Sequence, residues 1–91
     1  MNPGPSIGRI VHYRLSAQDV QRIYASQQGA NPLHGIGNPA APGDDFPAVV
    51  VRVWNPTSVN LQVLLDGPDN LWVTSATEGE QQGNWFWPPR V

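Results

Sequence analysis

Arginine and tryptophan side chains recur together along the second half of the chain, with a threonine beside them. They are Arg52, Trp54, Trp72, Thr74, Trp85, Trp87 and Arg90. Indole rings stack on bases and other planar ligands, and the guanidinium group of arginine binds a phosphate or a carboxylate through two parallel donors. Arg52 with Trp54, and Trp72 with Thr74, have a spacing that places both side chains on one face of a β-strand. This pattern predicts a binding site for a small nucleotide-like ligand.

His12, Tyr13 and Arg14 form a second group of chemically versatile side chains. A histidine acts as an acid or a base beside a positioned partner, and the sequence offers only His34 and a few loop acids for that role. The spacing of the histidines and acids matches no known metal site. We therefore expect no enzymatic activity, no metal and no cofactor, and we assign His12, Tyr13 and Arg14 to ligand binding.

The composition limits the possible classes of protein. A chain of 91 residues forms one domain, 1–91, and the absence of cysteine excludes disulfides and thiol catalysis. The net charge of −2 argues against general DNA or RNA binding, which depends on a basic surface. The apolar stretches are shorter than the roughly 20 residues that cross a bilayer, and the N-terminus lacks the features of a signal peptide. We expect a cytoplasmic protein that does not interact with membranes.

The elements that must position these residues are mainly strands. Turn sequences such as NPTS and DGPDN separate five segments of high β-propensity, which are residues 8–15, 48–54, 59–65, 71–77 and 84–87. Short strands at such spacing predict a mainly β fold, namely a small SH3-like antiparallel barrel or curled sheet of about five strands. One short helix over 16–29 and a long Gly/Pro-rich loop over 29–47 are inserted after the first strand.

The expected helix has recognisable ends, and four of its residues share one stripe. Ser16 can cap its first turn, with Asp19 three residues later in an imperfect capping box, and Gly29 ends it. The stripe consists of Val20, Ile23, Tyr24 and Gln27. The following loop is long for so small a domain. We expect its NPLHGIG segment, residues 31–37, to be ordered when a ligand or partner is present, because its leucine and isoleucine would otherwise expose apolar surface.

Alternation along the strands predicts two faces. In the first strand one face carries Val11, Tyr13 and Leu15. The opposite face carries Ile10, His12 and Arg14. In the later strands an aliphatic face combines Val49, Val51, Val53, Leu61, Val63, Leu71 and Val73. The opposite face combines Arg52, Trp54, Gln62, Trp72 and Thr74. Rings mixed with hydrogen-bonding groups are typical of a ligand site. The alternative, that these rings cover the helix and the loop, stays open.

The C-terminal segment GNWFWPPRV alternates in the same way. Phe86 is expected to point to one side, and Trp85 and Trp87 to the other. A small barrel accommodates one large ring at its closing strand more easily than two. We therefore assign Phe86 to the core, and Trp85 and Trp87 to a pocket or an interface, with Arg90 held beside them by two prolines.

The segments SIGRIVHY, AVVVRVW, VNLQVLLDG and GNWFWPPR together resemble a group of small proteins from bacteriophages and prophage-bearing bacteria. Those proteins open with a Gly-Arg-x-Val-His-Tyr segment and close with Trp-x-Trp-Pro. The resemblance covers most of the chain, except the helix and the Gly/Pro loop. It implies a phage-type origin, and small nonenzymatic phage proteins commonly serve as virion parts or as inhibitors of host defence.

Two functions follow as expectations. The first is a non-enzymatic binding protein that sequesters a nucleotide-derived immune signal in the cytoplasm of the infected or prophage-bearing bacterium. The alternative is a phage structural or assembly protein that uses its aromatic face as a subunit interface. A symmetric homo-oligomer, with a dimer as the commonest form, is expected because the aromatic surface exceeds what one small barrel can cover.

Overall fold

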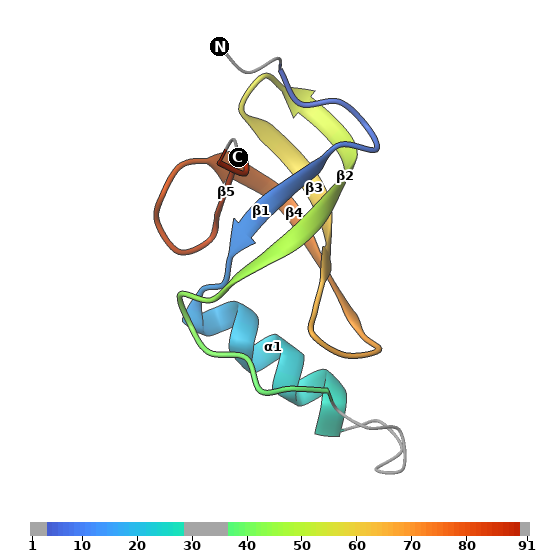
Figure 1. Cartoon of the computed structure of the whole chain (residues 1–91), viewed down its shortest axis with the longest axis vertical. Coiled ribbons are helices and arrows are strands. Elements are labelled where there is room, and N and C mark those ends of the chain that lie inside the picture. The colour runs from blue at the N-terminus through green and yellow to red at the C-terminus, as the bar shows by residue number, and fades with distance from the viewer. Residues whose placement is uncertain (1–3, 29–36, 90–91) are drawn as a thin grey trace.

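The computed structural model describes residues 4–28 and 37–89 and confirms the predicted SH3-like barrel with one helix. Five strands form a closed barrel in the order β1-β2-β3-β4-β5 (Figure 1). The elements are β1 (Ile10–Arg14), α1 (Ala17–Gln28), β2 (Asp45–Asn55), β3 (Ser58–Leu64), β4 (Asn70–Glu78) and β5 (Asn84–Phe86). The second strand begins within the segment predicted as loop.

Strand pairing is antiparallel except between β4 and β5. β5 pairs antiparallel with β1, where Tyr13 lies opposite Trp85. On its other edge β5 pairs parallel with β4, through Thr77 opposite Asn84 and Glu78 opposite Trp85. The parallel pair is the difference from the predicted antiparallel barrel. β5 therefore runs in the same direction as β4 and opposite to β1.

The core follows the predicted alternation in three of the strands. Val11, Tyr13 and Leu15 are buried, and so are the inward-facing residues of β3 and β4, which are Val59, Leu61, Val63, Leu71 and Val73. In β2 the predicted phase is wrong, because Ala48 and Val50 are buried. The predicted core residues of this strand, Val49, Val51 and Val53, are half-buried or exposed.

A β-bulge explains why Arg52 and Trp54 nevertheless lie on the outer face. The pairing of β2 with β3 shifts between Val50 and Arg52, so Arg52 lies opposite Asn60. A bulge adds one residue to one strand and reverses the direction of the side chains beyond it. Val50 therefore points into the barrel, whereas Arg52 and Trp54 lie outside it.

The closing strand reverses the predicted roles of its two central rings. Trp85 is fully buried, and its Nε1–H donates to the backbone oxygen of Thr57 at 3.1 Å. Phe86 is only half-buried, so its assignment to the core is wrong. Trp87 is half-buried, packs on the core and meets Trp85 edge to face at 5.5 Å between ring centroids. The two strands beside β5 leave room for the larger ring inside the barrel.

Helix α1 lies at one end of the barrel and begins with the predicted capping box (Figure 1). The backbone N–H of Asp19 donates to Ser16 Oγ at 3.1 Å, and the N–H of Ser16 donates to Asp19 Oδ2 at 2.9 Å. Val20 and Ile23 are buried against the barrel end. In the part of the chain that the structure describes, no helix is both long and apolar enough to span a bilayer.

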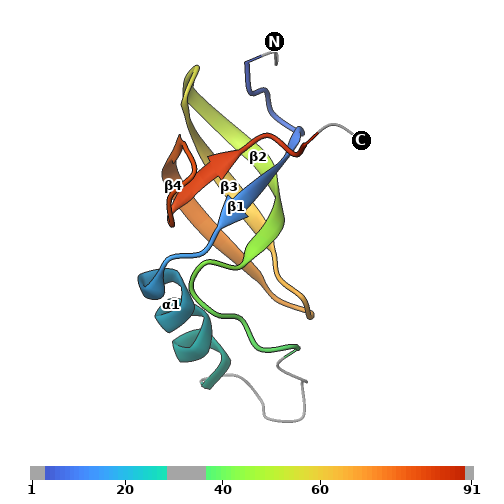
Figure 2. The ribbon, with the colours of Figure 1, turned by 60° about the vertical axis from the view of Figure 1, so that its left-hand side comes forward.

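The segment 37–44 runs beside α1 back to the barrel (Figure 2). Ala40 is buried, and its backbone oxygen accepts a hydrogen bond from the hydroxyl of Tyr24. The backbone N–H of Asn38 donates to the backbone oxygen of Asp66 in the β3–β4 turn at 2.8 Å. This half of the Gly/Pro loop is therefore anchored to both the helix and the sheet. The prediction of order in NPLHGIG falls, except for Gly37, outside the described residues.

Candidate functional site

The outer face of β2, β3 and β4 brings together the five residues predicted to share a face. Gln62 lies opposite Trp72, and the bulges bring Trp54 and Thr74 to the same side chain of β3, Asn60. Trp54 is 51% exposed and Trp72 is 50% exposed. Two large rings thus face solvent on one sheet, where they are available to a ligand or a partner.

Asn60 organises the upper part of this face. It is only 7% exposed, and its Oδ1 accepts three hydrogen bonds. The donors are Trp54 Nε1 at 2.9 Å, Thr74 Oγ1 at 3.1 Å and the backbone N–H of Ser75 at 2.7 Å. Because a buried polar atom without partners is costly, this oxygen fixes the relative positions of β2, β3 and β4.

The backbone near Asn60 departs from regular strand geometry. β4 shifts its pairing with β3 between Val59 and Leu61, and Ser75 adopts a φ of 56°. A left-handed conformation is uncommon for a residue other than glycine. The N–H of Ser75 is thereby directed at Asn60 Oδ1. Such conformations persist where the surrounding contacts hold them, and they concentrate at functional sites.

Arg52 covers one face of the Trp54 ring. Its guanidinium carbon lies 4.2 Å from the ring centroid, in cation–π geometry. The seven side-chain carboxylates of the chain all belong to the described residues, and none forms an ion pair with Arg52. Arg52 and Trp54 therefore present a positive group and an apolar ring together on the surface.

A hollow of about 370 Å³ lies at the lower end of the same face, between α1 and the β3–β4 turn. Its apolar lining residues are Ile23, Ala25, Leu65, Leu71 and Trp72. Its polar groups are Arg22, Asp69 and Asn70. A small-molecule site is typically about 300–1,000 Å³ and mostly apolar, with a few polar groups that orient the ligand. The hollow fits this description.

Arg22 is held at the rim of the hollow by two contacts. One terminal nitrogen donates to the backbone oxygen of Trp72 at 2.9 Å. The other lies 3.9 Å from Asp19 Oδ1, and the side chain stays half exposed. The guanidinium group is thus held beside the backbone of Trp72, and half of the Arg22 side chain still faces solvent.

Comparisons with known protein families, with curated proteins and with solved structures found no match. The resemblance to phage proteins therefore stays a prediction, and the chemistry of the site has to be inferred from its own residues.

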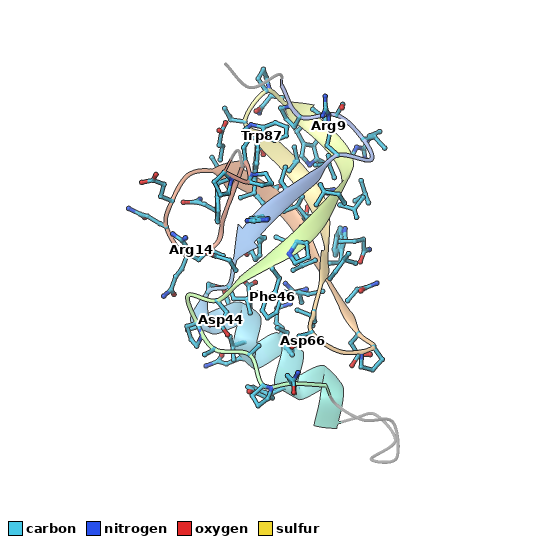
Figure 3. The ribbon with its side chains drawn as sticks, viewed as in Figure 1. Arg9, Arg14, Asp44, Phe46, Asp66 and Trp87 are labelled. Carbon is cyan, nitrogen blue, oxygen red and sulfur yellow. The ribbon has the colours of Figure 1, made fainter. Side chains whose placement is uncertain are left out.

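His12 and Arg14 lie on the other side of the barrel, around Phe86. The rings of His12 and Phe86 meet edge to face, with centroids 5.6 Å apart, and the guanidinium carbon of Arg14 lies 4.9 Å from the Phe86 centroid. Arg14 also donates to both carboxylate oxygens of Asp45, at 2.8 Å and 3.1 Å, and this hydrogen bonding raises the pKa of Arg14. Figure 3 shows Arg14 on the flank of the barrel. Two nitrogens of the Arg14 guanidinium group are therefore already occupied by the Asp45 carboxylate.

The remaining predicted site residues do not gather on the tryptophan face. Tyr13 and Trp85 are buried in the core, which is a correction to their expected place at a surface site. Both lie on inward positions of their strands. Trp87 lies at the barrel end away from α1 (Figure 3). Arg90 falls outside the described residues. In residues 4–28 and 37–89, no three His, Cys, Asp or Glu side chains gather as metal ligands would.

Sequence reasoning missed several residues that the structure adds to the site. Neither Asn60 nor Arg22 is among the predicted site residues. A signal for Asn60 exists, because an asparagine between Val59 and Leu61 interrupts a strand of high β-propensity. The hollow offers no such signal, since it depends on how α1 docks on the sheet.

Proposed function

We propose that the protein is a non-enzymatic binding protein for a small nucleotide-like ligand, which enters the hollow beside Trp72. The supporting observation is that the hollow is lined both by Trp72, which is half exposed, and by Arg22, whose guanidinium group is held by the backbone oxygen of Trp72. A base stacked on an indole contributes roughly 1–3 kcal/mol. Arg22 can bind a phosphate, and Asp69 and Asn70 supply hydrogen-bonding groups for a sugar or a base edge.

The most specific form of this proposal is sequestration of a nucleotide-derived immune signal in the cytoplasm of a phage-infected or prophage-bearing bacterium. It combines the chemistry of the hollow with the resemblance to phage proteins. Sequestration requires affinity without turnover, so the ligand is expected to be recovered unchanged.

Thermal melting with a ligand panel tests the proposal. The panel consists of mononucleotides, cyclic dinucleotides and ADP-ribose derivatives. A ligand at a hundred times its dissociation constant raises the free energy of unfolding by about 2.7 kcal/mol. Trp72→Ala and Arg22→Gln should abolish the stabilisation. Trp54→Ala is the matched control, because Trp54 is equally exposed but does not line the hollow. Stabilisation that survives Trp72→Ala, or its absence with every compound, contradicts the proposal.

A second candidate function, subunit assembly, is favoured by apolar side chains on the outside of the barrel. Ile10, Val51, Leu64 and Trp72 are each at least 38% exposed. In a symmetric homo-oligomer such a surface would be covered by a second copy. Light scattering at high micromolar concentration distinguishes the states, since a monomer has a mass of 9.9 kDa.

A further inference from the structure

The Arg52–Trp54 surface, made of Arg52, Trp54, Asn60 and Thr74, is a second site separate from the hollow. We propose that it binds an acidic peptide segment of a partner protein. An aspartate or glutamate of that segment pairs with Arg52, and a neighbouring side chain packs on the Trp54 ring. Three features of the surface carry this inference.

The first feature is the fixed orientation of Trp54. An exposed tryptophan ordinarily loses rotamer freedom when a partner binds, and this lost conformational entropy weakens binding. Here the indole N–H already donates to the buried oxygen of Asn60 at 2.9 Å, and the Arg52 guanidinium group covers one ring face. The other contacts of Asn60 Oδ1 tie the ring to β4. The ring is therefore preorganised while it remains half exposed, as in the central residues of many protein interfaces.

The second feature is that Arg52 forms no ion pair within residues 4–28 and 37–89. Arg14 pairs with Asp45 at 2.8 Å, and Arg22 lies 3.9 Å from Asp19. Arg52 instead stacks on an aromatic ring and forms no ion pair with any of the chain's side-chain carboxylates, all of which are described. A stacked guanidinium group keeps its N–H edges directed away from the ring, where they can receive a carboxylate in bidentate geometry.

The third feature decides between an acidic peptide and a nucleic acid. Nucleic-acid affinity requires several cations along a phosphate backbone, whereas this surface holds one arginine in a chain with a net charge of −2. On this face the neighbour of Arg52 is the exposed ring of Trp54, because Val53 between them lies opposite the core residue Val59. One charge beside one apolar ring matches a peptide with an acidic residue next to an apolar one.

Selection from a displayed library of short random peptides tests the inference, with the full chain as bait. We expect enriched peptides with an aspartate or glutamate next to an apolar residue. Measured by fluorescence anisotropy, their affinity should fall at least tenfold with Arg52→Gln and with Trp54→Ala. Replacing the peptide's acidic residue by the corresponding amide should lower its affinity for the unchanged protein by the same factor. The same replacement should lower its affinity for Arg52→Gln only slightly.

Two variants serve as controls in the same assay. Trp72→Ala removes an equally exposed ring and Arg14→Gln removes another arginine, and both should leave peptide affinity within twofold. Melting curves establish that each variant is folded. The inference is overturned if no peptides are enriched, if the enriched peptides lack acidic residues, or if Arg52→Gln leaves affinity unchanged. It is equally overturned if Arg52→Gln alone converts an oligomer to monomers, or if single-stranded RNA binds this surface.

Discussion

The hydroxyl of Tyr13 donates a 2.6 Å hydrogen bond to Oδ2 of Asp19, and both side chains are buried. The same carboxylate oxygen caps the first turn of α1 through the backbone N–H of Ser16. One oxygen thus connects the first strand of the barrel to the start of the helix. The position of α1, and with it the wall of the hollow, depends on this contact.

Alkaline pH should therefore destabilise the protein through Tyr13. Burial, together with the hydrogen bond to Asp19, raises the pKa of Tyr13 above its ordinary value. The unfolded chain releases this proton near pH 10 while the folded chain retains it, so the free energy of unfolding falls as the pH rises above about 10. Tyr13→Phe should show a weaker decline above pH 10 in urea unfolding. At pH 7 it should be about 1–3 kcal/mol less stable, because Asp19 loses a buried partner. Parallel declines in both proteins would contradict this role.

Removal of the Asn60 side chain should destabilise the barrel from its outer face. Asn60→Ala leaves three donors without their acceptor, including a backbone N–H held in a left-handed turn. An unsatisfied buried donor costs about 1–3 kcal/mol. Gln62→Ala is the control on the same face of β3 and should change stability by less than about 0.5 kcal/mol. Equal midpoints of chemical denaturation for the two variants would show that the Asn60 contacts contribute little.

Removal of the two aromatic rings of β5 should destabilise the protein by different amounts. Trp85→Ala removes a fully buried side chain and should cost roughly 3–5 kcal/mol, enough to unfold so small a domain. Phe86→Ala removes a half-buried ring that touches His12 and Arg14, and should cost about 1–2 kcal/mol. Thermal melts and circular dichroism measure both. A folded Trp85→Ala beside an unfolded Phe86→Ala would contradict the observed core.

Glycine is required at position 37 for two separable reasons. It has a φ of 82°, and a Cβ there would lie 2.6 Å from the backbone oxygen of Asp66. Gly8 also has a positive φ, of 92°, but open space around it. Gly8→Ala should therefore show only the conformational cost, about 1–2 kcal/mol, whereas Gly37→Ala should cost more and detach the segment from the β3–β4 turn. If chemical denaturation shows equal losses in the free energy of unfolding for the two variants, the backbone at Asp66 moves away from the added Cβ at little cost.

The fold was predictable because local signals agreed along most of the chain. The capping residues Ser16 and Asp19 and the alternation of β1 led to the correct elements. Which residues of β2 point into the barrel was not predictable. The segment AVVVRV is apolar on both faces of the strand, and a bulge then reverses which alternate side chains point inward. A bulge is set by tertiary contacts, here those around Asn60, and not by the residues of the strand itself.

The candidate site was predictable in part for the same reason. A spacing of two residues correctly placed Trp72 and Thr74 on one face of β4, and the bulge happened to preserve the pair of Arg52 and Trp54. The assignment of Trp85 failed because alternation gives two sides but does not say which is inside. That choice depends on the volume available between β1 and β4, which only the closed barrel defines.

The pairing of Tyr13 with Trp85 joins strands from opposite ends of the chain. In a refolding chain the β2–β3 and β3–β4 hairpins can form before β5 reaches β1, because that last pairing closes a loop that spans most of the chain. Until then the apolar interior lacks the indole that fills it, and the open sheet is exposed to aggregation. The quenching or shift of Trp85 emission should consequently be the last optical change in refolding, after the sheet signal has appeared.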